Sequence, residues 1–293
     1  MPTFILKKSM RFIFSLILIV AFNQINTAQS LVCDSNSRAL FEQKQQFLSK
    51  DDLKGLKSSE RIIAIAKSFL GTEYVAKTLD QNTENEDLVI ELVGVDCTTF
   101  LEYVSALNYI YCKKDVTFDA FTEALKLFRY RNGHLDGYVS RLHYFTEWLQ
   151  DNEQKGLLSI ESKNLGGVSM NKPLNFMSEH IESYPQLKAS TQNQELLKEV
   201  ERDISPQTIH YISQEKIKSI ENEIKDGDLI ALSTSIKGLD VVHVGFALHQ
   251  NGRLHLLHAS TTGMKVEISE KPLAEMVTGN KIQNGIIVSR LKH

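Results

Sequence analysis

Residues 241–260 have the sequence VVHVGFALHQNGRLHLLHAS, in which two apolar stretches flank Asn251-Gly252. Both stretches alternate as β-strands do, with successive side chains facing opposite sides of a sheet. Asn-Gly between two such stretches is a strong signal for a two-residue type I′ turn, because both residues tolerate a positive φ. The sequence therefore predicts an antiparallel β-hairpin centred on Asn251-Gly252.

The register of this hairpin sorts its histidines. With the turn at Asn251-Gly252, His258 lies opposite Gly245, and His243 lies opposite Ser260. Because side chains alternate along a strand, these four residues share one face of the sheet. His243 and His258 are then diagonal neighbours within reach of each other's side chains. His255 falls on the opposite face, so the register selects two of the histidines.

Helical periodicity dominates the sequence before this hairpin, and strand patterns dominate after residue 226. We expect helices at 58–71, 96–111, 117–128, 138–149, 195–204 and 214–224, and strands at 88–95, 228–234, 241–250, 253–260 and 285–291. This order favours an α+β fold, with a helical N-terminal part packed on a C-terminal antiparallel β-sheet. We expect one domain over residues 31–293, elaborated in its middle region at about 113–225.

The N-terminus has the layout of a secretory signal peptide. Lys7, Lys8 and Arg11 precede an apolar run at residues 12–22, and small residues follow it. Residues 1–30 are therefore predicted to be a signal peptide, and the remainder to be exported, to the periplasm in a Gram-negative cell. The alternative is an uncleaved membrane anchor, although a spanning helix needs about 20 apolar residues.

The overall composition gives little indication of a macromolecular partner. A net charge of −3 and a pI near 6.3 do not favour binding to nucleic acid. No membrane association is expected after removal of the signal peptide, and the sequence does not indicate an oligomeric state.

A cysteine stands where a helix is predicted to begin, in VGVDCTTFLEYVSAL at residues 93–107. Asp96 is a favoured N-cap residue, which makes Cys97 the first residue of the helix. The unpaired backbone N–H groups and the helix dipole place partial positive charge there, and this favours the nucleophilic thiolate form of Cys97. The alternative is a structural cysteine, because unpaired cysteines are often buried.

Cys33 and Cys112 are the other two cysteines of the chain. In an exported protein they could pair and leave Cys97 free, or both could remain unpaired and buried. The sequence leaves these alternatives open.

The two selected histidines complete a possible catalytic group. A cysteine nucleophile needs a base, and the base needs a group that orients its ring. We assign His243 as the base, because it lies beside the small Gly245, and His258 as the orienting residue. A zinc site is the chemical alternative, but the register places His255 on the wrong face and no further ligand completes a set. No cofactor is expected.

Several short motifs occur in an order that resembles the NlpC-type cell-wall cysteine hydrolases, which have a papain-like fold. The similarity covers roughly residues 60–290 and is greatest to a branch of periplasmic N-acetylmuramoyl-L-alanine amidase-like proteins. The motifs are GTEY (71–74), VDCTTF (95–100), RYRNG (129–133), YVSRLHYFTEWL (138–149), DGDLIAL (226–232), GLDVVHVG (238–245), HVGFAL (243–248) and LHAS (257–260).

The resemblance implies roles for individual residues. It makes Cys97 the nucleophile, His243 the base and His258 the orienting residue, and it places Tyr74 in the substrate cleft. In the endopeptidase relatives, the aspartate before the cysteine contacts the free amine of L-Ala. An amidase substrate has no free amine there, so Asp96 would serve as a cap only.

The resemblance also implies an activity, which is hydrolysis of the amide between N-acetylmuramic acid and L-Ala in anhydro-muropeptides. Arg129, Arg131 and Arg141 are candidates for binding substrate carboxylates, because guanidinium groups pair with carboxylates bidentately. Two alternatives are a γ-D-glutamyl–diamino-acid endopeptidase that uses the same three residues and a non-catalytic wall-binding module.

Overall fold

The computed structural model describes residues 30–292. The predicted signal peptide lies outside the described residues, apart from its last position. Among the described residues, no helix combines the length and the apolar character that a membrane span requires.

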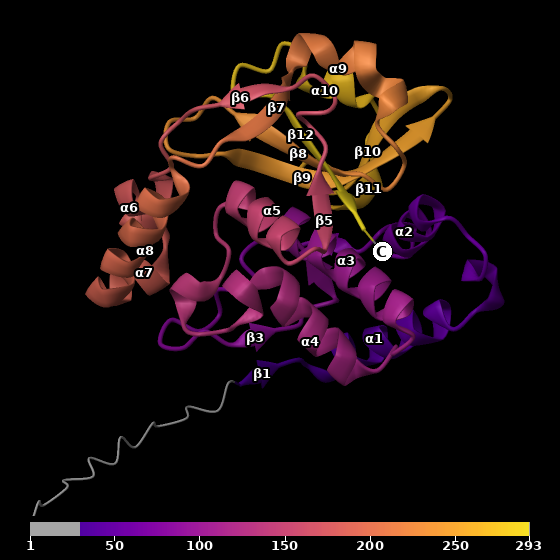
Figure 1. Cartoon of the computed structure of the whole chain (residues 1–293). Helices are drawn as coiled ribbons and strands as arrows, with labels where there is room; N and C mark the ends of the chain where they lie inside the picture. The colour runs from indigo at the N-terminus through magenta and orange to yellow at the C-terminus, as the bar shows by residue number, and fades with distance from the viewer. Residues whose placement is uncertain (1–29, 293) are drawn as a thin grey trace, which may run out of the picture.

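A ten-stranded, mostly antiparallel sheet forms the upper half of the molecule (Figure 1). Its strands lie in the order β4-β2-β11-β10-β9-β8-β12-β7-β6, and β5 pairs with β12. The bounds are β2 Glu73–Tyr74, β4 Gly94–Val95, β5 Leu158–Ile160, β6 Val168–Met170, β7 Ile209–Ser213, β8 Leu229–Thr234, β9 Val241–Gln250, β10 Arg253–Ser260, β11 Lys265–Ile268 and β12 Gln283–Leu291. A separate parallel pair joins β1 (Leu31–Val32) to β3 (Leu88–Val89).

The predicted hairpin is confirmed. β9 and β10 pair antiparallel, from Gln250 opposite Arg253 to Phe246 opposite Leu257. Asn251 has φ 50 and the following glycine has φ 75, which are the two positive values that a type I′ turn requires. Turn chemistry in the sequence therefore determines the register of these two strands.

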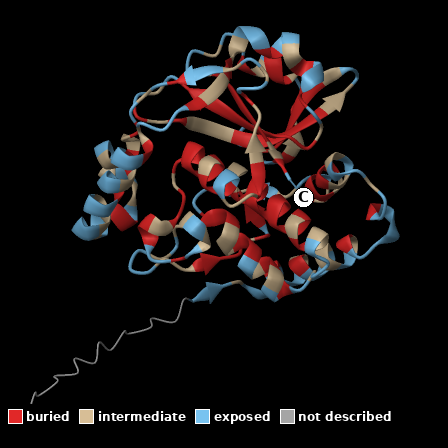
Figure 2. Cartoon of the chain, viewed as in Figure 1, coloured by how far each residue is buried: buried red, intermediate tan, exposed pale blue. Residues whose placement is uncertain are grey.

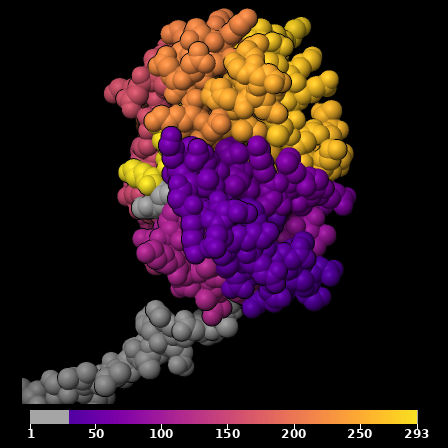
Figure 3. Space-filling model, turned by 90° about the vertical axis from the view of Figure 1, so that its right-hand side faces the viewer, coloured from indigo at the N-terminus to yellow at the C-terminus, as the bar shows by residue number. Residues whose placement is uncertain are grey.

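The helices lie in three groups around the sheet (Figure 1). Helices α1 to α5 cover one face, α9 and α10 cover the other, and α6 to α8 form a lobe at the side. Their bounds are α1 Ser35–Leu48, α2 Ser58–Lys67, α3 Cys97–Lys113, α4 Phe118–Arg129, α5 Phe145–Gln154, α6 Phe176–Glu179, α7 Pro185–Ala189, α8 Thr191–Ile204, α9 Gln214–Ile220 and α10 Leu273–Val277. Seen from the side, the N-terminal segment lies below the C-terminal strands and helices (Figure 3).

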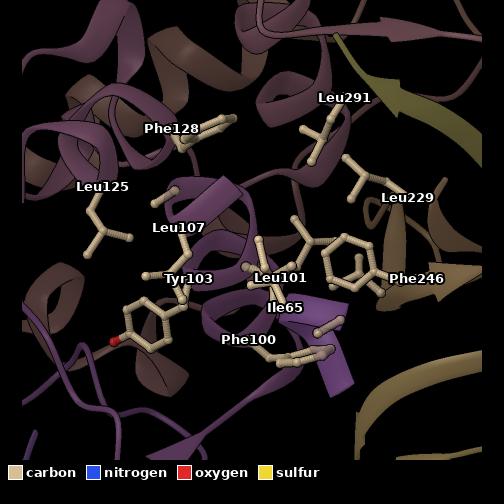
Figure 4. Packing of buried hydrophobic residues seen from close by; sticks show 14 of the residues in the cluster. Ile65, Phe100, Leu101, Tyr103, Leu107, Leu125, Phe128, Leu229, Phe246 and Leu291 are labelled. Carbon is tan, nitrogen blue, oxygen red and sulfur yellow. The ribbon is translucent and has the colours of Figure 1, made fainter. Parts of the chain in front are cut away.

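The largest core cluster lies between the sheet and α3. Phe100 and Leu101 of α3 are fully buried beside Phe246 of β9 and Leu229 of β8 (Figure 4). The rings of Phe100 and Phe246 meet edge to face, with centroids 5.7 Å apart. Burial is densest in α3 and the central strands, and the outer surface of the α6–α8 lobe is exposed (Figure 2). This packing fixes the position of α3, and therefore of its first residue, against β9.

Two predicted elements differ most from the structure. The strand expected at 88–95 is two short strands, because the intervening N–H groups bond to distant side chains: that of Glu91 to the Tyr103 hydroxyl and that of Leu92 to Ser37 Oγ. The helix expected at 138–149 begins only at Phe145.

Candidate active site

The first turn of α3 holds Cys97 in place. Asp96 is the N-cap, as predicted, and its carboxylate accepts a hydrogen bond from the Thr99 N–H at 2.7 Å. In return, Thr99 Oγ1 accepts from the Asp96 N–H at 2.9 Å, which completes a capping box. Cys97 is therefore the first helical residue, and its own backbone N–H has no partner within the helix.

The Cys97 sulfur accepts a hydrogen bond from the backbone N–H of Val244. Val244 directly follows His243 in β9. The thiol therefore lies within one residue of the predicted base, although the two residues are far apart in the sequence.

The expected thiolate is not what this environment favours. Burial, followed by the negative charge of Asp96, raises the pKa of the Cys97 thiol to about 12, and the hydrogen bond from Val244 opposes this only in part. The sequence argument predicted that the helix start lowers the pKa of Cys97, and this prediction was wrong because the pKa is raised. Desolvation outweighs the favourable groups at the helix start, and the thiol is protonated at neutral pH.

The two selected histidines are in direct contact, as the register predicted. His243 Nε2 and His258 Nδ1 are 2.6 Å apart, and the rings are nearly perpendicular, at 87°. Burial lowers the pKa of His243 to about 3, with a further contribution from His258. Burial also lowers the pKa of His258 to about 4. Both imidazoles are therefore neutral at pH 7.

A neutral pair can share only one proton across this hydrogen bond. If Nε2–H of His243 donates to Nδ1 of His258, then Nδ1 of His243 carries a lone pair and can accept a proton from a thiol. In that state His258 carries its own proton on Nε2. The contact is therefore compatible with the tautomer that a base requires.

Tyr74 lies near the cysteine, and its place in a substrate cleft remains a prediction. In the parallel pair of β2 and β4, Tyr74 lies opposite Val95, two residues before Cys97. Burial raises the pKa of the Tyr74 hydroxyl, and the charges of Cys97 and Asp96 add to this effect. The structure therefore brings Tyr74, Asp96 and Cys97 together.

Arg129 is not available to a substrate. It is 1% exposed, and its Nε donates to Glu102 at 2.7 Å while Nη1 donates to the Val89 carbonyl at 2.8 Å. The prediction that Arg129 binds a substrate carboxylate is therefore wrong, because its guanidinium is enclosed and holds a carboxylate of this chain.

Arg131 and Arg141 also hold carboxylates of this chain. Arg131 Nε donates to Glu147 at 2.7 Å. Arg141 donates to Asp80 at 3.0 Å and to Glu86 at 3.0 Å. A substrate contact by either arginine remains a prediction, and it would have to compete with these ion pairs.

Asp240 is a residue that the sequence reasoning missed. It is 2% exposed, and its carboxylate accepts from Thr146 N–H at 2.7 Å, Thr146 Oγ1 at 2.8 Å and Val241 N–H at 2.8 Å. These bonds tie Asp240, which directly precedes β9 and is three residues before His243, to the first turn of α5. Its place in the GLDVVHVG motif was the available signal.

The remaining cysteines and histidines form neither a disulfide nor a metal site in the described part of the chain. Cys33 and Cys112 are both free, and Cys112 Sγ accepts from Arg61 at 3.2 Å. His255 hydrogen-bonds the Ser269 carbonyl at 2.8 Å. Within residues 30–292, no three His, Cys, Asp or Glu side chains are grouped as metal ligands.

Comparison with known proteins identifies the family. The chain belongs to the N-acetylmuramoyl-L-alanine amidase-like family, whose model matches residues 64–286. This membership indicates an amidase-type hydrolase with a peptidoglycan-related substrate. No curated protein matches the chain significantly.

Solved structures agree with this family. An N-acetylmuramoyl-L-alanine amidase from Bacteroides uniformis is 36% identical, with a TM-score of 0.77 over 80% of this chain and 99% of that chain. A candidate xylanase from Bacteroides fragilis is 37% identical, with a TM-score of 0.74 over 78% of this chain and 99% of that chain. The LPG0564 protein of Legionella pneumophila is 23% identical, with a TM-score of 0.63 over 87% and 97% of the two chains, and shows the fold alone.

Proposed function

We propose that this protein is a cysteine hydrolase that cleaves the amide between N-acetylmuramic acid and L-Ala in peptidoglycan fragments, with anhydro-muropeptides as the substrates. One observation carries the proposal. The Cys97 sulfur bonds the N–H of Val244, next to His243, and His243 contacts His258 at 2.6 Å. The amidase-like family supports the choice of an amide bond.

In the proposed reaction, the Cys97 thiol attacks the lactyl carbonyl as His243 Nδ1 takes its proton. The backbone N–H of Cys97, at the start of α3, is positioned to stabilise the oxyanion. His243 then passes the proton to the departing L-Ala nitrogen, which leaves a thioester on Cys97. Water, deprotonated by His243, hydrolyses this thioester and restores the thiol.

This assignment does not require a preformed thiolate. Because both the thiol and the imidazole are neutral at rest, the proton moves to His243 only as the carbon–sulfur bond forms. His258 assists by keeping Nδ1 of His243 free to accept that proton. Tyr74 would line the cleft beside the reacting carbonyl.

We also propose that the fold is papain-like and that the protein is exported after removal of residues 1–30. The order of the elements supports the first, because α3 carries the cysteine and packs on β9, which carries His243. The basic and apolar N-terminus supports the second.

The test is digestion of defined anhydro-muropeptides, with products identified by mass spectrometry. The wild-type protein should release the free sugar and the intact stem peptide, and Cys97→Ala should release neither. Release of the L-Ala-γ-D-Glu dipeptide instead would show an endopeptidase. Equal turnover by wild type and Cys97→Ala would reject a cysteine hydrolase, and binding without turnover by either would show a wall-binding module.

A further inference from the structure

His258 lies on β10, between β9 and β11, and each of these two strands places a polar side chain on the same face as its imidazole. On one side, β9 places His243 against His258 Nδ1 at 2.6 Å. On the other side, β11 places Glu267 directly opposite His258 in the antiparallel register. Because directly opposed residues of two strands project to the same face, the Glu267 side chain lies on the face that carries the histidine pair.

The turn before β11 makes room for the Glu267 carboxylate. A Cβ atom added to Gly263 would lie 2.3 Å from both carboxylate oxygens, so the carboxylate rests where only a glycine leaves space. The turn itself is held by the Gly263 N–H, which donates to Ser260 Oγ at 2.9 Å. The carboxylate of Glu267 therefore lies against this turn, on the strand next to the one that carries His258.

Several charged groups lie near the histidine pair. On β8, the residue opposite His243 is the uncharged Leu232. By register, Lys265 and Glu267 of β11 and Glu73 of β2 lie on the face that carries His258. Asp96, Cys97 and Tyr74 lie at and beside the start of α3. Glu267 is the group whose charge raises the pKa of His258 against the stronger lowering by burial.

We propose that Glu267 is a positioning residue, whose negative charge, directly opposite His258 in the register of β10 and β11, favours the tautomer of His258 that keeps its proton on Nε2. Nδ1 of His258 is then free to accept from His243, and Nδ1 of His243 is free to take the Cys97 proton. The same negative charge stabilises the imidazolium that forms on His243 during attack, as an orienting carboxylate does in other triads. The inference rests on the proposed function and extends the arrangement from three residues to four.

The test compares Glu267→Gln with wild type, and Glu270→Gln serves as the control for loss of one exposed carboxylate on the same segment. Loss of the Glu267 charge lowers the proton affinity of the pair. We therefore expect kcat to fall by about tenfold with KM within twofold, and the acid limb of kcat/KM to move to lower pH by roughly half a unit. Glu270→Gln should match wild type.

A second variant keeps the Glu267 charge but fills the space beside Gly263 that the carboxylate occupies. Gly263→Ala should displace the carboxylate and shift the acid limb in the same direction as Glu267→Gln. An unchanged kcat and an unchanged acid limb in Glu267→Gln would overturn the proposal.

A readout independent of turnover separates this proposal from the proposed function. Titration of the His243 and His258 ring nitrogens by NMR should show lower pKa values in Glu267→Gln than in wild type. If wild type does not cleave muropeptides, the proposed function fails while this titration still tests Glu267. Identical titration curves in the two proteins would reject the role of Glu267.

Discussion

Helix α3 contributes to two very different sets of polar groups. At its first residue, Cys97 lies near the His243–His258 pair, and all three groups are neutral at pH 7. Little more than one turn further along, Glu102 forms a fully buried ion pair with Arg129, at 2.7 Å. The first set consists of neutral groups that can exchange a proton, and the second is a pair of opposite charges.

The two sets differ in their partners as well as in burial, because Cys97 and His243 are only partly buried whereas Glu102 and Arg129 are almost fully buried. Burial disfavours the charge on Arg129, but the charge and hydrogen bond of Glu102, together with Tyr103 and Tyr130, more than compensate, and the pKa of Arg129 is raised above its usual value. The thiol of Cys97 has no cation of this kind, so burial keeps it neutral. We expect changes in the first set to alter chemistry, and changes in the second to alter stability.

The largest effect is expected from His243→Ala. Loss of the base should lower kcat by about 10³-fold or more, roughly 4 kcal/mol in activation free energy, with an unchanged free energy of unfolding. Steady-state kinetics and chemical denaturation would measure the two quantities. His255→Gln is the matched control, because His255 hydrogen-bonds Ser269 and does not contact the pair. An equal fall in kcat in His243→Ala and His255→Gln would show that the effect is not specific to the histidine pair.

Arg129→Met should have the opposite profile. It leaves the Glu102 carboxylate buried without its partner, which costs about 3 kcal/mol of folding stability, while the methionine side chain retains most of the apolar packing. Urea denaturation would measure this loss. The kcat of the folded fraction should remain within about twofold of wild type. A large fall in kcat in fully folded Arg129→Met would instead show that Arg129 takes part in substrate binding or catalysis.

Asp96 has both a structural and an electrostatic role beside Cys97, and two substitutions separate these roles. Asp96→Ala removes the cap on α3 and should cost about 1 kcal/mol of stability. Asp96→Asn keeps a capping oxygen but removes the charge, so it should retain most of that stability and lower the pKa of the Cys97 thiol. Denaturation and the rate of thiol alkylation would distinguish these outcomes. Equal alkylation rates in Asp96→Asn and wild type would show that the charge does not reach the thiol.

The parts that the sequence predicts well are those with local causes. Asn251-Gly252 fixes a turn, the turn fixes the register, and the register brings His243 and His258 together. Asp96 marks the start of α3 in the same way, because a cap acts within four residues of the chain.

The parts that the sequence does not predict have distant causes. The interruption of the strand at 88–95 depends on Tyr103 and Ser37, which only the folded chain brings there. The ion pairs of Arg129 and Arg141 depend on carboxylates from remote segments. The protonated state of Cys97 follows from burial by the whole core, which a helix pattern cannot reveal.

The central claim is that Cys97 is the nucleophile and stays protonated until it reacts. The direct measurement uses the chain with Cys33→Ser and Cys112→Ser, so that Cys97 is the one remaining thiol, and follows iodoacetamide adduct formation and loss of muropeptide cleavage together across pH. We expect activity to disappear in proportion to the adduct, and the alkylation rate to rise continuously from about pH 5 to about pH 9. Fully alkylated protein that still cleaves muropeptides would contradict it, as would a rate that is already constant at about pH 5.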